Sequence, residues 1–471
     1  AAVAHHRATG QTDLLDAARR WVDYLRADHD AGNPYYTQPA LWEHCEYEIG
    51  FLRLARETGE SKYLDFAITL AMELNHVGPT VADIKAGGAL HAVRVGYLLA
   101  GMADLHMETG REDLAEHLEA LWTELVETRM YITGGMASHG EHISPTPFDL
   151  PHTQKDPDRT MGETCSSIAL ILFGWRMHSL TGESHYFDTI ETILYNHLLG
   201  ALSLDGLGCF YYNPLRVTGD QTHRTDHWHT PATTRCMLPE INKTACCMPN
   251  FWRFLGALPE YAYSTDDDGL FVNLYEASRV ARTLPDGRAV AMNVETRYPH
   301  DGAIAVRIEG DTPVRFALRL RIPSWCEAPT AAWPGREAAP VAAGEYLVID
   351  REWTPGDTVT LDLPMPVRMI LPDERIEANR GQVVFAKGPV LFCLETHSRF
   401  PVEKVRIPFG PDDVASEVAE EWRGDLLGGI TRLRLTAEVN GLPLVMAMIP
   451  WSVRANTEPD NARWIIYLPL A

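Results

Sequence analysis

Apolar residues recur at helical spacing through the first half of the chain, and a Thr-Gly pair interrupts this pattern four times. Each pair separates the end of one amphipathic segment from an acidic or aromatic opening to the next. Glycine ends a helix in the left-handed conformation, and acidic residues favour the positive N-terminus of the following helix. The pattern predicts repeated αα-hairpins that stack to bury their apolar faces. The pairs begin at Thr9, Thr58, Thr109 and Thr181.

A stack of hairpins closes into an α/α toroid or stays open as a solenoid, and periodicity alone leaves this choice open. Four hairpins and a further helix near Asn250 to Tyr263 are fewer than a complete ring needs. The opening Ala1-Ala2-Val3 resembles the interior of a helix, so we expect further chain upstream. We therefore expect an α/α toroid that is incomplete at its N-terminus.

From about Ser264 the apolar residues alternate with polar ones, which is typical of strands. AVAMNVETRY and AIAVRIEG are examples, and turns such as Pro285-Asp286-Gly287 separate the strands. Many short strands at this spacing predict one or two antiparallel β-sandwich domains. The expected order is α then β, with a catalytic domain at residues 1–264, a sandwich at 265–372 and a second sandwich at 373–471.

Charge narrows the range of partners. The 471 residues contain 41 Lys and Arg against 64 Asp and Glu, a net charge of −23. Such a chain repels phosphate backbones and anionic membrane surfaces, so we expect no nucleic acid or membrane partner. No apolar run reaches the roughly 18 residues of a membrane span. Neutral substrates fit this charge better.

Two short motifs could hold a metal ion. Gly162-Glu163-Thr164-Cys165 opens one predicted helix, and Ala245-Cys246-Cys247-Met248-Pro249-Asn250 precedes another. Thiols at helix N-termini are favoured as thiolates. Three thiolates and one carboxylate suit tetrahedral Zn²⁺. Free cysteines are also commonly buried as small hydrophobes, and the spacing alone leaves both interpretations open.

These motifs, with others in the same order, resemble the bacterial β-L-arabinofuranosidases of glycoside hydrolase family 127. The further segments that carry the resemblance are YITGGMASHGEHISPTPFDLP, FYYNPL, LPEYAYSTDDDGLFVNLY and GQVVFAKGPVLFCLE. The resemblance implies a zinc-dependent retaining glycosidase that acts on a carbohydrate. Glu163, Cys165, Cys246 and Cys247 fall on the family's zinc ligands. Cys246 also falls on its nucleophile, and Glu141 on its general acid/base.

Four other positions match the family's sugar-binding pocket more loosely. Imidazole, carboxylate and phenol groups suit the hydroxyls of a furanose, but the same residue types also occur as hydrogen-bonded interior groups. The chain departs from the family pattern at Met248, which replaces a proline, and at Gly162, where asparagine is common. The four pocket positions are His44, His91, Glu191 and Tyr211.

The leading hypothesis is a hydrolase that releases terminal β-L-arabinofuranose or a similar sugar. One alternative is a related hydrolase with a different sugar, and another is a carbohydrate-binding protein with structural zinc. A lyase or epimerase on the same helical fold would need a His or Tyr base and no thiolate cluster. An acid at Glu141 beside an accessible Cys246 would favour the hydrolase. Reduced thiols favour the cytoplasm, and the sequence leaves homo-oligomerisation open.

Overall fold

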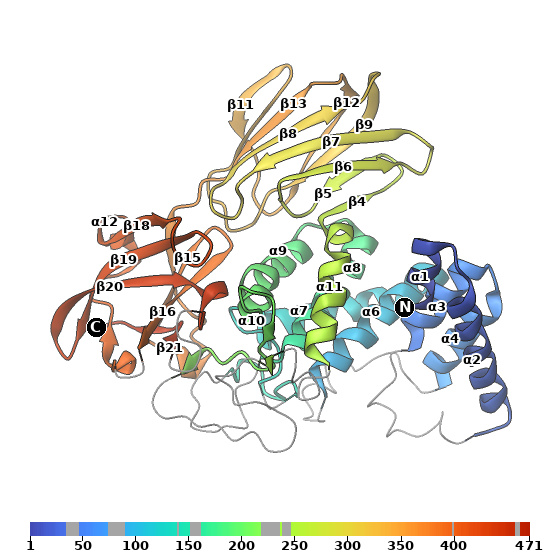
Figure 1. Ribbon diagram of the computed structural model, residues 1–471, viewed down its shortest axis with the longest axis horizontal. Helices are drawn as coiled ribbons and strands as arrows, with labels where there is room; N and C mark the ends of the chain where they lie inside the picture. The colour runs from blue at the N-terminus through green and yellow to red at the C-terminus, as the bar shows by residue number, and fades with distance from the viewer. Residues whose placement is uncertain are drawn as a thin grey trace.

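The computed structural model describes residues 1–33, 47–73, 90–138, 141–150, 162–217, 236–237, 246–397, 400–456 and 462–471. Within these ranges the first half of the chain is helical and the second half is built of β-sheets (Figure 1). The change falls at the end of the last long helix, where Ala262 is followed directly by a strand that begins at Tyr263. The predicted order of a helical part followed by β-rich parts with antiparallel sheets is confirmed.

The helical part contains hairpins joined at the predicted Thr-Gly pairs. Its described helices are α1 (Ala2–Thr9), α2 (Asp13–Asp30), α3 (Tyr47–Thr58), α4 (Ser61–Glu73), α6 (Ala92–Thr109), α7 (Glu112–Thr128), α8 (Thr164–Thr181), α9 (His185–Thr192), a π-helical turn η3 (Ile193–Leu198), α10 (Leu199–Ala201) and α11 (Cys247–Ala262). Three short strands also belong to this part of the sequence: β1 (Gly208–Cys209), β2 (Arg216–Val217) and β3 (Cys236–Met237).

The Thr-Gly pair ends a helix by two separate contacts. Gly110 follows α6 with a φ of 66°, and its N–H donates to the His106 carbonyl. Glycine adopts this left-handed backbone at the lowest cost of all residues. The Thr109 hydroxyl donates to the Leu105 carbonyl, 2.7 Å away, and so satisfies one of the last carbonyls of the helix. The same contacts recur after α1, α3 and α8, which explains why the pair repeats in the sequence.

Helices α6 and α8 cross with almost no space between them. A Cβ atom added to Gly96 of α6 would lie 2.7 Å from the Ala169 Cβ atom of α8 and 2.9 Å from the Ala169 carbonyl carbon. Glycine at position 96 is therefore required for this approach. The contact fixes the relative position of the two helices, and both begin at residues of the candidate site described below.

The first β-rich part is a sandwich of two sheets above α8, α9 and α11 (Figure 1). Buried residues of both sheets belong to one core, which continues into the helical part. All strand pairs are antiparallel except β5 with β9, which is parallel and departs from the prediction. One sheet has the order β11 (Arg336–Pro340), β10 (Thr330–Trp333), β13 (Thr358–Asp362), β8 (Ala303–Glu309), β7 (Ala289–Thr296), β6 (Ser278–Thr283), and the other β12 (Tyr346–Trp353), β9 (Val314–Arg321), β5 (Gly269–Val272), β4 (Tyr263–Thr265).

The second β-rich part lies beside α9 and α10 (Figure 1). Strand β2 of the helical half pairs with β21 of this part, so the two are joined by backbone hydrogen bonds as well as by packing. The strands are β14 (Val367–Ile370), β15 (Gln382–Lys387), β16 (Val390–His397), β17 (Val405–Arg406), β18 (Val418–Arg423), β19 (Ile430–Val439), β20 (Leu442–Pro450), β21 (Ala462–Ile465) and β22 (Leu468–Pro469), with one short helix, α12 (Val414–Glu417), and 3-10 turns at Glu377–Asn379, Val402–Lys404, Pro411–Asp413 and Trp451–Val453.

Candidate active site

Three helix N-termini converge on one group of polar side chains. His91 precedes α6, Glu163 precedes α8 and Cys246 precedes α11, each at the N-cap position. The N–H groups in the first turn of a helix have no partner within the helix, and the helix dipole adds positive potential there. The site therefore lies where the backbone favours negative charge, which suits thiolates and carboxylates.

The four predicted metal ligands come together. Ligand atoms of Glu163, Cys165, Cys246 and Cys247 all lie within 4.8 Å of one another. Cys246 Sγ lies 3.8 Å from Cys247 Sγ, almost twice the length of a disulfide bond. Glu163 Oε1 lies 3.9 Å from Cys246 Sγ and 3.7 Å from Cys247 Sγ. Glu163 and Cys246 are 83 residues apart in sequence, yet the two motifs form one cluster that could bind a metal ion.

The cluster contains one exposed thiol, two buried thiols and one buried carboxyl group. Cys246 is exposed, and the thiols of Cys165 and Cys247 hydrogen-bond to it and lower its pKa far below the ordinary value. The hydrogen bond with Cys246 raises the pKa of Cys165, and burial raises that of Cys247. Burial, followed by the charge of Cys246, raises the pKa of Glu163. Four acidic groups at this spacing cannot all ionise without a cation, so the donor set fits a metal ion.

Glu163 is held from both sides of its backbone. Gly162 has a φ of 49°, in the left-handed region that glycine and asparagine adopt most readily. This explains why glycine can replace asparagine before Glu163. The backbone of Glu163 forms an antiparallel bridge with Tyr212. The side chain is 1% exposed, and its Oε2 atom has no hydrogen-bond partner among the described residues. A buried carboxylate oxygen without a partner is a further sign of an absent ligand.

Glu141 lies next to this cluster, with a donor at each carboxylate oxygen. The hydroxyl of Tyr211 donates to Oε1, and His91 Nε2 lies 3.1 Å from Oε2. Donor atoms of His91, Glu141 and Glu163 are all within 4.8 Å of one another. The backbone carbonyl of Glu141 also accepts from the N–H of Ala92, the first residue of α6. The start of α6 therefore positions Glu141 through both its backbone and its side chain.

The helix start also determines which nitrogen of His91 carries the proton. The N–H of Val93 donates to His91 Nδ1, so Nδ1 acts as an acceptor. In the neutral ring the proton is then on Nε2. His91 Nε2 thus donates to Glu141, which aligns the carboxylate group.

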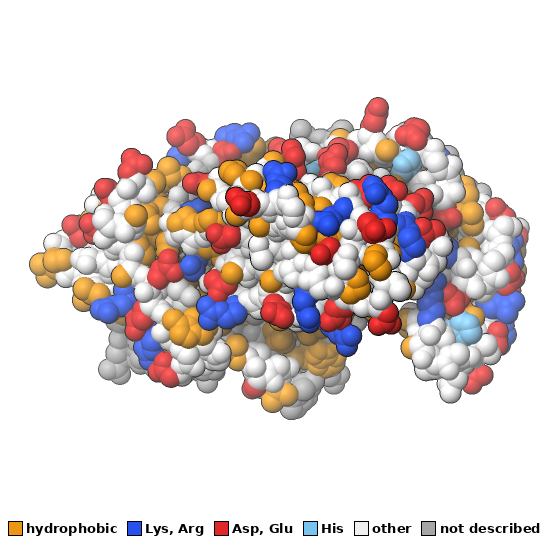
Figure 2. All heavy atoms as spheres, turned by 90° about the horizontal axis from the view of Figure 1, so that it is seen from above, with side chains coloured by type: hydrophobic (Ala, Val, Ile, Leu, Met, Phe, Trp, Pro, Cys, Tyr) orange, Lys and Arg blue, Asp and Glu red, His pale blue; other side chains and the backbone are white. Residues whose placement is uncertain are grey.

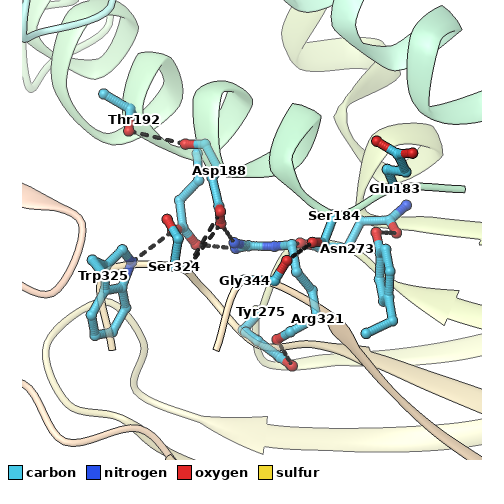
Figure 3. Close-up of polar contacts among 12 residues, drawn as sticks. Glu183, Ser184, Asp188, Thr192, Asn273, Tyr275, Arg321, Ser324, Trp325 and Gly344 are labelled. Atoms are coloured by element: carbon cyan, nitrogen blue, oxygen red, sulfur yellow. Dashed lines mark hydrogen bonds and ion pairs between the residues drawn. The ribbon is translucent and has the colours of Figure 1, made fainter. Parts of the chain in front are cut away.

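Glu191 is predicted from the sequence to lie in the sugar pocket. In the structure its carboxylate contacts residues other than His91, Glu141 and Tyr211. The guanidinium of Arg321 and the hydroxyl of Tyr298 donate to its Oε1, and Trp325 Nε1 donates to Oε2 at 3.0 Å. These three residues belong to the first β-rich part. Arg321 also donates to Asp188 of α9 at 2.5 Å (Figure 3). Glu191 is 1% exposed and joins the helical part to the sandwich.

Of the other three predicted pocket residues, two lie beside the cluster and one falls outside the described residues. His91 and Tyr211 both lie against Glu141, as described above. His44 lies outside the described residues. Nothing in the sequence marks Asn213 as part of the site, although it lies two residues after Tyr211 in the motif FYYNPL; its amide donates to the Gly162 carbonyl at 3.0 Å. Arg321 is likewise not distinctive in the sequence, and its carboxylate partners lie about 130 residues earlier in the chain.

One face of the molecule carries charges of both signs (Figure 2). Figure 2 shows acidic and basic side chains interspersed on one face of the molecule, with no broad basic field. None of the described helices combines the length and the apolar character that a bilayer crossing requires.

Comparison with protein families defines the class. Residues 1–260 match the catalytic domain of the glycoside hydrolase family 127 β-L-arabinofuranosidases, residues 269–365 the middle domain and residues 367–467 the C-terminal domain of that family. The protein is a glycoside hydrolase. Because the catalytic-domain match alone covers more than half of the chain, the chain belongs to glycoside hydrolase family 127.

Individual relatives agree with this assignment. A non-reducing end β-L-arabinofuranosidase of Bifidobacterium longum subsp. longum is 28% identical over 480 residues, which cover 93% of this chain and 70% of the relative. The crystal structure of a family 127 β-L-arabinofuranosidase from Geobacillus stearothermophilus T6 is 27% identical with a TM-score of 0.82, covering all of this chain and 78% of that one. A second solved glycoside hydrolase is 28% identical with a TM-score of 0.85, covering 99% of this chain and 81% of that one.

Proposed function

We propose that this protein is a zinc-dependent retaining exo-glycosidase that releases terminal β-L-arabinofuranose or a similar sugar from a glycan. Cys246 is the nucleophile and Glu141 is the general acid/base. The observation that carries the proposal is the exposed Cys246 thiol at the edge of an otherwise buried cluster of ligands, with Glu141 beside that cluster. A purely structural metal site would be closed on all sides and would need no adjacent acid.

The spacing of the donor atoms supports zinc. Tetrahedral Zn²⁺ with bonds of about 2.3 Å to sulfur and 2.0 Å to oxygen separates two sulfur ligands by about 3.8 Å, and sulfur from oxygen by about 3.5 Å. The corresponding distances here are 3.8 Å between Cys246 and Cys247, and 3.7 Å between Cys247 and Glu163. Thiolate-rich sites favour zinc over magnesium or calcium. Glu163, Cys165, Cys246 and Cys247 would hold the ion, which keeps bound thiols deprotonated at neutral pH.

The first step transfers the sugar to sulfur. The Cys246 sulfur forms a bond to the anomeric carbon while the bond from that carbon to the aglycone oxygen breaks. Glu141 gives its proton to that oxygen, which leaves as an alcohol. His91 and Tyr211 hold the two carboxylate oxygens of Glu141, so the acid is aligned before the sugar binds.

The second step releases the sugar and restores the enzyme. Glu141, now a carboxylate, removes a proton from water as the water oxygen bonds to the anomeric carbon and the carbon–sulfur bond breaks. Cys246 returns as a thiolate. Two displacements at one carbon retain its configuration, so the product is the β-sugar. Cysteine takes the place of the carboxylate nucleophile of most retaining glycosidases.

The sugar specificity rests on similarity alone. The names of the relatives support β-L-arabinofuranose, and the alternative is a related hydrolase with another sugar. We propose that His91 and Tyr211, besides holding Glu141, also contact the sugar. His44 remains a proposed residue of the same pocket. Glu191 is fully engaged with the sandwich, so we assign it no direct sugar contact.

The larger architecture is part of the same proposal. We infer an α/α toroid at residues 1–264, a sandwich at 265–372 and a second sandwich at 373–471. The three helix N-termini that meet at the site support a toroid, in which helix ends line one mouth. Reduced, metal-binding thiols favour a cytoplasmic location.

The decisive experiment traps the sugar on the enzyme. An aryl β-L-arabinofuranoside with an activated leaving group, which makes the first step fast, is mixed with the zinc-loaded protein, quenched in acid and analysed by peptide mass spectrometry. A pentosyl mass on the peptide that carries Cys246, accumulating further in Glu141→Gln, is the expected result. An active enzyme that never carries this mass, or carries it on another residue, would refute the assignment of Cys246.

A further inference from the structure

A buried arginine of the second β-rich part contacts the segment that carries Tyr211. This residue is Arg454, which is 0% exposed. We propose that Arg454 is a positioning residue for the metal-binding cluster and acts through Asn213 on Glu163. The inference deepens the proposed function and rests on it where it concerns the metal. It would make the C-terminal β-rich part a component of the active site.

Arg454 is fixed on several sides. Its guanidinium lies 3.9 Å from the centre of the Trp451 ring and 5.2 Å from that of Phe210. Nη1 donates to the Gly200 carbonyl at 2.9 Å, and Nη2 donates to Asn213 Oδ1 at 2.8 Å. A side chain held by stacking and by directed hydrogen bonds has little freedom to move. Arg454 therefore presents a fixed donor to Asn213.

This donor determines the orientation of the Asn213 amide. A guanidinium has only donors, so the oxygen of the amide must face Arg454 and the NH₂ group must face the opposite side. On that side Asn213 Nδ2 donates to the Gly162 carbonyl and to Thr164 Oγ1, both at 3.0 Å. These two residues flank Glu163. Arg454 is thus connected to both neighbours of a proposed metal ligand through one side chain.

The backbone extends this connection. The N–H of Thr164 donates to the Tyr211 carbonyl at 3.0 Å, and the Thr164 hydroxyl donates to the Phe210 carbonyl at 2.7 Å. The segment from Phe210 to Asn213 therefore runs beside Glu163 and carries Tyr211, which donates to Glu141. A shift of Asn213 would therefore displace Glu163 and Tyr211 together.

The opposite side of the cluster is anchored in the same part of the fold. Met248, directly after Cys247, is 0% exposed and packs in one apolar core with Trp451 and Trp464. Trp464 Nε1 also donates to the Pro214 carbonyl at 2.8 Å. One motif of the cluster is thus connected to the C-terminal part through Asn213, and the other shares a buried core with it through Met248. Methionine in place of the family's proline adds apolar surface to this core.

Two variants separate positioning from general stability. Arg454→Met removes the donor while keeping a long side chain that can stack on Trp451. Asn213→Asp keeps an acceptor for Arg454 but cannot donate to the Gly162 carbonyl, so it breaks the connection without unpairing the arginine. Arg432→Met is the matched control, because Arg432 is an arginine of the same β-rich part that pairs with Glu421 at 2.7 Å.

Two readouts are measured on each folded variant. The first is the affinity for Zn²⁺ in competition with a chromophoric chelator. We expect a loss of about 10- to 100-fold in Arg454→Met and Asn213→Asp, which is typical of residues that orient metal ligands, and no loss in Arg432→Met. The second is amide hydrogen exchange of residues 162–166 in the metal-free protein, which we expect to be faster in the first two variants only.

The outcomes distinguish this inference from the proposed function. Wild-type affinity together with wild-type exchange in Asn213→Asp would overturn the role of Arg454, and this variant decides the matter if Arg454→Met does not fold. A wild-type protein that binds no zinc would overturn the zinc proposal. Exchange in the metal-free protein would still decide whether Arg454 positions residues 162–166.

Discussion

His91 donates a hydrogen bond from Nε2 to Glu141 Oε2 over 3.1 Å, and its Nδ1 caps the helix that begins at Ala92. One side chain therefore caps the start of a helix and aligns a carboxylate. This double contact makes it possible to remove one role and keep the other.

Replacing His91 with asparagine should lower kcat by roughly 10- to 100-fold with little change in stability. Asparagine is a good N-cap and can accept from the Val93 N–H, but it is too short to reach Glu141. Steady-state kinetics and thermal unfolding measure the two effects. A rise in KM with an unchanged kcat would instead assign His91 to sugar binding alone.

Cys246→Ser should reduce kcat/KM for an aryl arabinofuranoside by about a thousand-fold or more, because a serine hydroxyl is not ionised at neutral pH. The matched control is Cys326→Ser. Cys326 is buried in the first β-rich part, where its thiol lies 3.8 Å from the Pro364 carbonyl, and a serine hydroxyl can donate to the same oxygen. Activity in Cys246→Ser equal to that of the control would exclude Cys246 as the nucleophile.

Removal of the metal should lower both activity and thermal stability. The cluster joins the start of α8 to the start of α11, so its ligands lose a shared partner and regain repulsion between acidic groups. Dialysis against a chelator, followed by calorimetry and elemental analysis, should show a melting temperature several degrees lower that recovers with added Zn²⁺. A fully active protein without bound metal would contradict the proposed role.

Glu191→Gln should destabilise the fold by about 2–4 kcal/mol and leave KM nearly unchanged. The substitution removes the charge that faces the buried guanidinium of Arg321. Urea unfolding measures the free energy of unfolding, and Glu183→Gln, at a carboxylate that is 60% exposed, is the control. A large increase in KM with unchanged stability would return Glu191 to the sugar pocket.

His178 should make the fold sensitive to acid. Burial lowers its pKa from 6.5 to about 4, since the ring lies among Phe187, Phe271 and Tyr346. Between these pH values the unfolded chain binds more protons at this site than the folded chain. The free energy of unfolding therefore falls as the pH drops below 6.5, by up to about 3 kcal/mol.

The measurement for His178 is urea unfolding at a series of pH values between 7 and 4. His178→Gln should flatten the dependence, because glutamine does not titrate. His185→Gln, at a side chain that is 43% exposed, should leave it unchanged. Identical slopes in the wild type and in His178→Gln would show that other groups cause the acid sensitivity.

The sequence predicted those features that depend on local chemistry. The Thr-Gly pairs end helices by contacts within five residues, and the helix starts at Glu163 and Cys246 follow from their own motifs. The resemblance brought these two motifs together into one site. Glu141 was likewise identified by the motif around it and not by any pattern of its own.

Features that depend on distant partners could not be predicted. Glu191 has the residue type of a sugar ligand, and its ion pair with Arg321, 130 residues later, leaves no trace in the local sequence. Asn213 and Arg454 are 241 residues apart, and neither is distinctive in the sequence. The parallel pairing of β5 with β9 is also invisible to an alternation pattern, which is the same for both strand directions.

Glycine at position 96 has no Cβ atom, and this connects the close packing of two helices to the geometry of the site. Helices α6 and α8 touch at Gly96 and Ala169, and their N-termini carry His91 and Glu163. A homologue with a bulkier residue at either position would have to spread these helices apart and so increase the distance between His91 and Glu163. A new sugar preference would then be expected to evolve through changes in the loops, while positions 96 and 169 keep small residues.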